Sequence, residues 1–325
     1  MPEDVLAQDK GKTAIPLDHF YVERQSGDIF RKLLRNLNFG ASTGYGNTFF
    51  SHELTGFGIY QANGGSPQIF SGTTATRYGN WVNDVTIDKS VASPGFSVRS
   101  DTAKLGFKGN GLNIPLQIFL YYGFKDRYRI GAGYSYELMS IGSLHPTTYK
   151  DKIADFQPPS PTGFIRKYYG LFGYSFYRMG EYLFTADLQV GNYLLKSNFN
   201  SALVTSDLYY NLGVTFERDF SEYFKVFVRP SFELKSYYIV IPESSKAIDH
   251  TINALYINVG VTYRIPELPR CFLKDCHVQI NHAHGNKEYR SRRHPVYKKQ
   301  NPGYGENDKT LIKYRGKNKK KLNPY

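Results

Sequence analysis

The sequence lacks a long apolar segment. Its 325 residues contain no uninterrupted apolar run near 18 residues, the length that a membrane-spanning helix needs. The mean hydropathy of −0.46 also argues against a helical membrane protein. It does not exclude a membrane β-barrel, in which only every second residue of a strand faces lipid.

Cysteine, tryptophan and methionine are scarce. The two cysteines, Cys271 and Cys276, are too few for a disulfide-stapled scaffold. One Trp and three Met stand against 28 Tyr and 23 Phe, a composition typical of β-structure. The opening MPEDVLAQDK has neither the basic nor the apolar region of a secretory signal, and we interpret Leu6, Ala7 and Gln8 as the remnant of one.

Catalytic signatures are also missing. We find no GxSxG, HExxH, phosphate-binding loop or paired-carboxylate spacing in the sequence. We therefore predict that the protein is not an enzyme and has no catalytic residue and no cofactor. Charged residues within strands, such as Glu137 and Asp187, are expected to form a structural ion-pair network.

A strict two-residue alternation is what the sequence does have. In GLNIPLQIFLYYGFKDRYRIGAGYSYELMSI (111–141), apolar residues occupy every even position before and after a charged Lys125–Arg127 turn. This period predicts two β-strands joined by a tight turn. Each has about 13 residues, whereas strands of globular proteins usually have about 5–6.

The alternation recurs along the chain and predicts eight long strands, whose approximate ranges are 37–45, 112–124, 128–138, 163–177, 182–194, 207–217, 223–235 and 252–264. Short turns alternate with longer loops at 46–109, 143–162, 197–205 and 239–250. Even strand number and this alternation of connections are typical of a transmembrane β-barrel, which must close because an open edge in lipid leaves backbone groups unpaired. We therefore predict an all-β fold, an eight-stranded antiparallel transmembrane β-barrel with both termini in the periplasm of the outer membrane.

A soluble, lipocalin-like cup alternates in the same way, with its apolar face inside. Two features favour the membrane barrel. The polar face is rich in small and oppositely charged residues, including Arg129, Glu217 and Glu233, which suit a narrow filled lumen. Tyr and Phe, such as Tyr122 and Phe216, lie near strand ends as interfacial girdles do.

The run LNIPLQIFLYYGFKDRYRIGAGYSYEL resembles the hairpin of small Bacteroidota outer-membrane barrels, among them PorT-like and PorG-like components of type IX secretion and gliding. The resemblance covers roughly residues 30–264. It implies an eight-stranded barrel in the outer membrane and supplies no catalytic residues.

Three regions follow from the pattern: a periplasmic segment 1–30, a barrel 31–264 with a long extracellular loop 46–109, and a basic, largely irregular periplasmic tail 265–325. Of the net charge of +13, the tail holds 15 Lys and Arg against 5 Asp and Glu. Lys and Arg with interleaved Tyr would suit RNA in the cytosol, but a periplasmic location argues against nucleic acid. We instead predict that the tail binds a partner, with an acidic periplasmic protein favoured and anionic lipid headgroups or peptidoglycan carboxylates as alternatives. The residues expected to bind it are Tyr289, Arg290, Arg292, Arg293, Tyr297, Lys298, Lys299, Tyr314, Lys319, Lys320 and Lys321.

The segment CFLKDCHVQINHAH is the best candidate for a site. Cys271, Cys276, His282 and His284 could bind zinc, but the spacing C-x4-C departs from the common finger pattern. In the oxidising periplasm we expect a Cys271–Cys276 disulfide instead, with zinc or free thiols as alternatives.

The function predicted from the sequence is that of a non-enzymatic outer-membrane barrel in the lipid bilayer. Its tail would dock periplasmic or lipoprotein subunits of a larger complex, with type IX secretion as the context that the resemblance implies. The alternative is a barrel that binds a ligand, or forms a small pore, through its extracellular loops. Eight strands enclose a lumen that side chains just fill, so passage of large solutes is not expected.

Overall fold

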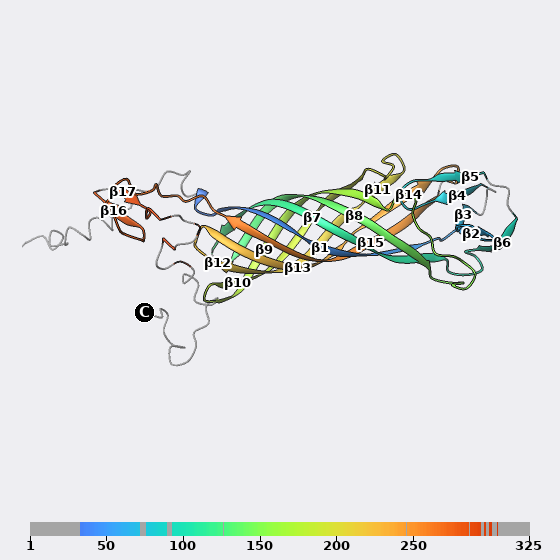
Figure 1. Ribbon diagram of the computed structural model, residues 1–325, viewed down its shortest axis with the longest axis horizontal. Helices are drawn as coiled ribbons and strands as arrows, with labels where there is room; N and C mark the ends of the chain where they lie inside the picture. The colour runs from blue at the N-terminus through green and yellow to red at the C-terminus, as the bar shows by residue number, and fades with distance from the viewer. Residues whose placement is uncertain are drawn as a thin grey trace, which may run out of the picture.

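The computed structural model describes residues 33–71, 76–89, 93–125, 127–244, 246–285, 287–293, 296, 299–300 and 304. Within these residues, eight strands form the barrel (Figure 1): β1 (Leu37–Glu53), β7 (Gly106–Phe124), β8 (Tyr128–Pro146), β9 (Thr162–Met179), β10 (Tyr182–Lys196), β12 (Leu208–Asp219), β13 (Phe224–Leu234) and β15 (Lys246–Tyr263).

All neighbouring barrel strands are antiparallel, in the order β1-β7-β8-β9-β10-β12-β13-β15, and β1 pairs with β15 to close the ring. Thr43 of β1, for example, pairs with Val259 of β15 on one side and with Leu116 of β7 on the other. Closure gives every strand two partners, as a sheet in lipid requires. The predicted eight-stranded antiparallel barrel is confirmed.

The predicted short turns are confirmed as well. Only three residues separate β7 from β8, two separate β9 from β10, and four separate β12 from β13. We call the end of the barrel that carries these turns the turn end, and the opposite end the loop end.

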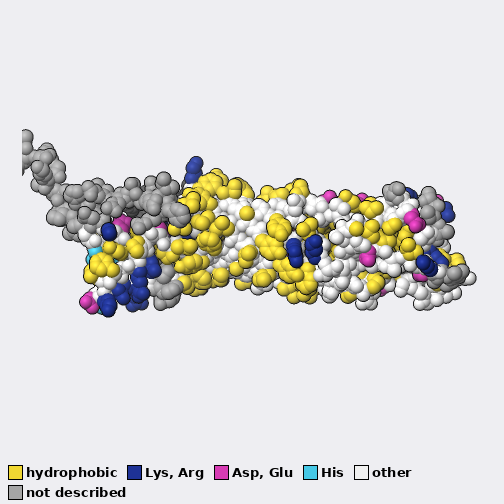
Figure 2. Space-filling view, turned by 90° about the horizontal axis from the view of Figure 1, so that it is seen from above, with side chains coloured by type: hydrophobic (Ala, Val, Ile, Leu, Met, Phe, Trp, Pro, Cys, Tyr) yellow, Lys and Arg dark blue, Asp and Glu magenta, His cyan; other side chains and the backbone are white. Residues whose placement is uncertain are grey.

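The apolar face of the barrel points outward. Leu116 is 60% exposed and its neighbour Gln117 is 7% exposed, and the same contrast holds for Ile257 and the buried Asn258. An apolar exterior around a polar interior is the reverse of a lipocalin, so the exterior faces lipid. Figure 2 shows these hydrophobic side chains as a band toward the turn end of the barrel.

The barrel is taller than a membrane. The outward residues of β7 are apolar from Phe124 back to Leu112, and the next two, Asn110 and Lys108, are polar. A strand of 19 residues, rising ~3.3 Å per residue and tilted by ~40°, is about 45–50 Å tall, against an apolar band of ~25 Å. The loop end therefore projects beyond the bilayer.

Part of the predicted first loop, 46–109, is strand. β1 continues to Glu53 and β7 begins at Gly106. In the described residues between them, a separate sheet has the order β5-β4-β3-β2-β6 and stands at the loop end (Figure 1). Its strands are β2 (Phe57–Ala62), β3 (Gln68–Ser71), β4 (Arg77–Asn80), β5 (Thr86–Asp88) and β6 (Pro94–Arg99).

The predicted loop 239–250 is also largely strand. β14 (Ser236–Ile241) pairs with the first residues of β15, from Ser236 opposite Thr251 to Ile241 opposite Lys246, and β11 (Val204–Ser206) pairs with β14. These short segments prolong the barrel wall beyond the apolar band, and Tyr237, Ile239 and Ile241 of β14 pack into the loop-end core.

Beyond β15, the chain forms a small segment at the turn end. It holds a hairpin of β16 (His282–His284) and β17 (Lys287–Tyr289), joined through Gly285 at φ +60°. Residues 1–30, predicted to be a periplasmic segment, lie outside the described residues. Among the residues that are described, no helix is long and apolar enough to cross a membrane.

Candidate functional site

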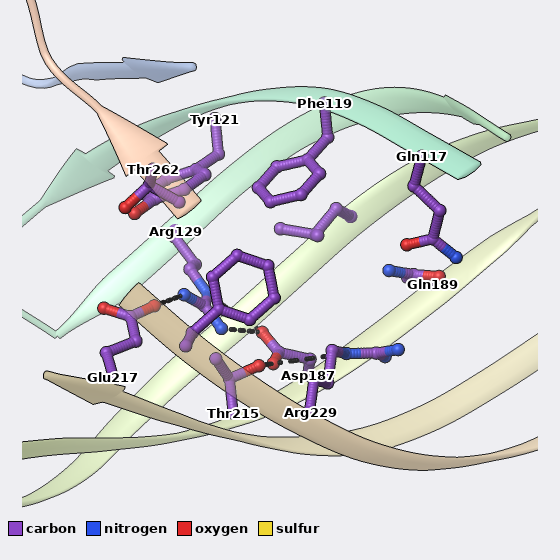
Figure 3. Close-up of a pocket in the computed structure, with 12 residues that line it drawn as sticks. Gln117, Phe119, Tyr121, Arg129, Asp187, Gln189, Thr215, Glu217, Arg229 and Thr262 are labelled. Carbon is purple, nitrogen blue, oxygen red and sulfur yellow. Dashed lines mark hydrogen bonds and ion pairs between the residues drawn. The ribbon is translucent and has the colours of Figure 1, made fainter. Parts of the chain in front are cut away.

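Buried charges fill the lumen toward the turn end (Figure 3). Arg129 of β8 donates to Asp187 of β10 at 2.8 Å and 2.5 Å, and also bonds Glu217 of β12. Arg229 of β13 lies 3.6 Å from the other oxygen of Asp187, which also accepts from Thr215. These residues come from four strands, so the pairs tie opposite walls of the barrel together.

Glycines make room for the two arginines. A Cβ atom at Gly173 would come within 2.5 Å of Arg129, and one at Gly213 within 2.7 Å of Arg229. The lumen is therefore so narrow that a methyl group opposite either guanidinium would collide with it. Its small cavity is lined by the same arginines and carboxylates together with Phe119, Tyr121 and Phe227.

A second buried network lies further toward the loop end. Lys167 of β9 lies 2.6 Å from Glu137 of β8 and 2.6 Å from Glu233 of β13. Lys235 lies 2.8 Å from Glu233, and the hydroxyl of Tyr256 donates to Glu137 at 2.7 Å. Two ammonium groups thus balance two carboxylates, and no net charge is left buried.

Glu137 and Asp187, which the sequence singled out as structural, lie in these two networks. Sequence reasoning missed Lys167, although the alternation held the signal: Tyr168 is outward, so its neighbour must point inward. Among the described residues, the two networks place buried, paired side chains across the lumen at two levels.

An aromatic core closes the loop end. Trp81, in the segment after β4, stacks on Phe156 with ring centroids 4.0 Å apart, and its carbonyl lies 2.9 Å from Nε2 of His250 in β15. Tyr78 donates to the carbonyl of Pro242 at 2.9 Å. The separate sheet is thus anchored on the barrel rim, an arrangement that periodicity in the sequence gave no signal for.

The predicted cysteine and histidine candidates come together. The ligand atoms of Cys271, Cys276, His282 and His284 all lie within 4.8 Å of one another. The two cysteines are not joined by a disulfide in this structure, and the disulfide expected in an oxidising periplasm stays a prediction. The sulfur of Cys271 lies beside His284, and that of Cys276 lies beside His282.

The predicted partner-binding residues are used in different ways. Arg293 is exposed. Arg292 donates to the carbonyls of Cys271 and Leu273 at 3.3 Å and 3.2 Å, so it holds the segment's own backbone. Tyr289 packs against Phe272, with ring centroids 5.3 Å apart, and Arg290 forms a backbone bridge with Arg270. Tyr297, Lys298, Tyr314, Lys319, Lys320 and Lys321 lie outside the described residues.

Part of the tail is docked on the barrel. The backbone N–H of Gln300 donates to both carboxylate oxygens of Glu222, at 2.8 Å and 3.0 Å, and Lys299 lies 3.8 Å from Glu181. The ring of Tyr304 lies 5.8 Å from the guanidinium of Arg178 in the barrel wall. Lys299, Gln300 and Tyr304 therefore lie at the mouth of the turn end.

The turn-end segment, residues 265–293, carries both apolar and basic side chains on its surface. Phe272 is 61% exposed, and Leu273, Val278 and Ile280 are more than 40% exposed. Lys274, Lys287 and Arg293 of the same segment are exposed too, as are Asp275 and Glu288, and Figure 2 shows basic side chains gathered at this end. Exposed apolar and charged side chains in one small segment are typical of a protein-binding surface.

The closed sheet, the outward apolar band and the filled polar lumen define a transmembrane β-barrel of the outer-membrane type. No family model matches the sequence, and a search of curated proteins finds no match. Three solved outer-membrane structures are similar to this chain in barrel architecture.

The OmpT protease of Escherichia coli aligns over 71% of this chain and 97% of its own, with 10% identity and a TM-score of 0.33. The outer-membrane protein AlkL aligns over 71% and 90%, with 10% identity and a TM-score of 0.34. OprG of Pseudomonas aeruginosa aligns over 70% and 96%, with 10% identity and a TM-score of 0.32. Values this low carry no argument about function, which must come from this chain's own residues.

Proposed function

We propose that this protein is a non-enzymatic outer-membrane barrel that docks a periplasmic protein on its turn end. In this orientation both termini and the turn-end segment lie in the periplasm, and the loop end faces outside. The observation that carries the proposal is the surface of the turn-end segment, which exposes Phe272 and Leu273 together with Lys274, Lys287 and Arg293.

The charge of this surface indicates the partner's chemistry. The turn-end segment, residues 265–293, holds six Lys and Arg against three Asp and Glu. A partner protein whose surface is apolar at its centre and acidic at its rim would complement the turn-end segment in both apolar contact and charge. The filled lumen supports the same conclusion, because it leaves the ends of the barrel as the surfaces available for binding.

Type IX secretion is the machinery that the sequence resemblance suggests for such a partner. The two motifs that carry this resemblance lie in neighbouring strands: Ile114–Leu116 in β7 and Gly131–Tyr134 in β8. No family model or curated relative adds to that resemblance, so it stays a hypothesis whose test is the identity of the captured partner.

The experiment is a charge reversal that spares the internal contacts of the segment. The triple variant Lys274→Glu, Lys287→Glu, Arg293→Glu should lose partners that co-purify with the wild type in mild detergent. Arg292 is left unchanged because it holds the carbonyls of Cys271 and Leu273. The matched control reverses three exposed lysines at the loop end, Lys89, Lys104 and Lys150.

Retention of the same partners by the turn-end variant would refute docking through this surface. Heat-modifiable migration on a gel confirms that each variant keeps its barrel. Loss of the partners from both triple variants would mean that overall charge, rather than this surface, is responsible.

A second candidate is ligand binding at the loop end. The observation in its favour is the five-stranded sheet β2–β6, whose Tyr78 and Trp81 are fixed on the barrel rim. A sheet held rigidly above the membrane is a suitable platform for a ligand. Replacing residues 55–104 by a short linker would then abolish function, whereas the turn-end charge reversal would leave it intact.

A further inference from the structure

We propose that Cys271, Cys276, His282 and His284 bind one structural zinc ion at the turn end. This inference stands independently of the docking function. Thiolate and imidazole are the ligands that zinc prefers, and four protein ligands without an open position are typical of structural rather than catalytic sites.

The distances suit a tetrahedral ion. Sγ of Cys271 lies 3.3 Å from Nε2 of His284, and Sγ of Cys276 lies 3.2 Å from Nε2 of His282. All four ligand atoms lie within 4.8 Å of one another. Around a tetrahedral zinc, with bonds of ~2.3 Å to sulfur and ~2.0 Å to nitrogen, ligand atoms are about 3.3–3.8 Å apart. Small side-chain shifts would therefore bring all four to an ion.

The histidines are oriented for this role. His282 and His284 are two residues apart on β16, so their side chains leave the same face of the strand. Nδ1 of His282 lies 2.9 Å from the carbonyl of Ile280. A carbonyl only accepts, so Nδ1 carries the proton and Nε2 presents its lone pair to the cysteines. Such an outer hydrogen bond accompanies metal-bound histidine as a rule.

The backbone around the cysteines is held from several sides. The N–H of Cys271 donates to the carbonyl of Arg290 at 3.0 Å, and the N–H of Cys276 donates to that of Leu273 at 3.3 Å. Arg292 bonds the carbonyl of Cys271. The cysteine turn and strand β16 thus supply the four ligands from separate parts of the segment.

The segment has little else to fold it. Among its described residues, Cys271 is the buried apolar side chain, while Phe272, Leu273, Val278 and Ile280 are exposed. A segment this small cannot bury enough surface to order itself without a staple. Zinc would supply that free energy, because its binding is coupled to folding and displaces two thiol protons into solvent.

The test measures metal in the full-length protein, extracted from membranes in detergent without reductant or chelator. We expect one zinc per chain by elemental analysis. After chelation and reconstitution with cobalt, we expect thiolate-to-cobalt charge-transfer bands and the intense visible bands of tetrahedral coordination. Cys276→Ser and His284→Ala should each lose the zinc, and the turn-end segment should become readily cleaved by protease.

The matched control is His277→Ala, because His277 is an exposed histidine next to Cys276 and outside the cluster. It should retain one zinc per chain. Heat-modifiable migration reports the barrel separately, so a variant that loses metal can be distinguished from one that fails to fold.

Three results would overturn the proposal. One is a purified protein that contains far less than one zinc ion per chain and takes up no zinc on reconstitution. Another is a Cys271–Cys276 disulfide in the purified protein, seen as thiols that resist alkylation until reduced. The third is zinc retained by both ligand variants, or copper in place of zinc at one ion per chain.

Discussion

The Nζ atom of Lys167 lies 2.6 Å from Oε2 of Glu137, and the two side chains are 2% and 0% exposed. Taking such charges out of water costs several kcal/mol for each ion unless a partner compensates. The lumen supplies that partner from the neighbouring strand, and a second from β13, where Glu233 lies 2.6 Å from the same atom.

Lys167→Met should therefore destabilise the barrel strongly. It leaves Glu137 and Glu233 buried with Lys235 as their remaining ammonium group. Removing one member of a buried ionic network typically costs ~3–5 kcal/mol. The free energy of unfolding in urea, measured in lipid vesicles, should fall by about this amount. Lys104→Met is the control: Lys104 and Glu53 are 84% and 62% exposed, so its loss should stay below ~1 kcal/mol.

Ile118→Arg should weaken insertion into the bilayer. Ile118 is 59% exposed near the middle of the outward apolar band of β7, and an arginine on the lipid face at mid-membrane costs ~2–4 kcal/mol. Leu273→Arg, at an exposed site of the turn-end segment, should change the barrel's unfolding free energy little. Equal stability of the Ile118→Arg variant and the wild type in vesicles would contradict a lipid-facing β7.

Trp81→Ala should detach the loop-end sheet while the barrel stays folded. Trp81 is fully buried and stacks on Phe156, and truncating a buried tryptophan typically costs ~3–5 kcal/mol. Protease added to the purified protein in lipid vesicles or detergent should then cleave between residues 54 and 105 much faster than in the wild type. Ile87→Ala, at a position that is 45% exposed, should leave the cleavage rate unchanged.

Glu222→Ala should release the tail from the mouth of the turn end. Its carboxylate accepts the backbone N–H of Gln300 in a buried setting, and a hydrogen bond to a charged group is worth ~1.5–3 kcal/mol. Cleavage after residue 293 in purified protein should accelerate. Glu181→Ala removes the half-exposed pairs with Lys299 and Arg218 and should have a much smaller effect. A similar acceleration in both variants would contradict docking through Glu222.

Much of the barrel could be predicted from the sequence, because strand periodicity is a local property. Every second residue of β7, from Leu112 to Phe124, meets the same environment, and the turn at Lys125 interrupts the pattern where the strand ends. For the same reason, charged residues such as Arg129 and Glu233 could be predicted to lie on one common face of the sheet.

The strands outside the membrane could not be predicted in this way. Beyond the apolar band, β14 and the sheet β2–β6 no longer separate lipid from lumen, so their residues need not alternate. Segments with apolar side chains in this region, such as Ile239 and Ile59, pack into the loop-end core instead.

The sequence by itself determined the alternation, the number of long strands and the concentration of positive charge in the tail, because each depends on residue order alone. The tertiary structure decided which face is outside, since periodicity is the same for a lipocalin and a membrane barrel. It also decided that Lys167 joins Glu137 and Glu233 across the lumen, and that the ligand atoms of both cysteines and both histidines lie within 4.8 Å of one another. The lumen contacts join residues that are distant in sequence, and only the closed ring brings them within bonding distance.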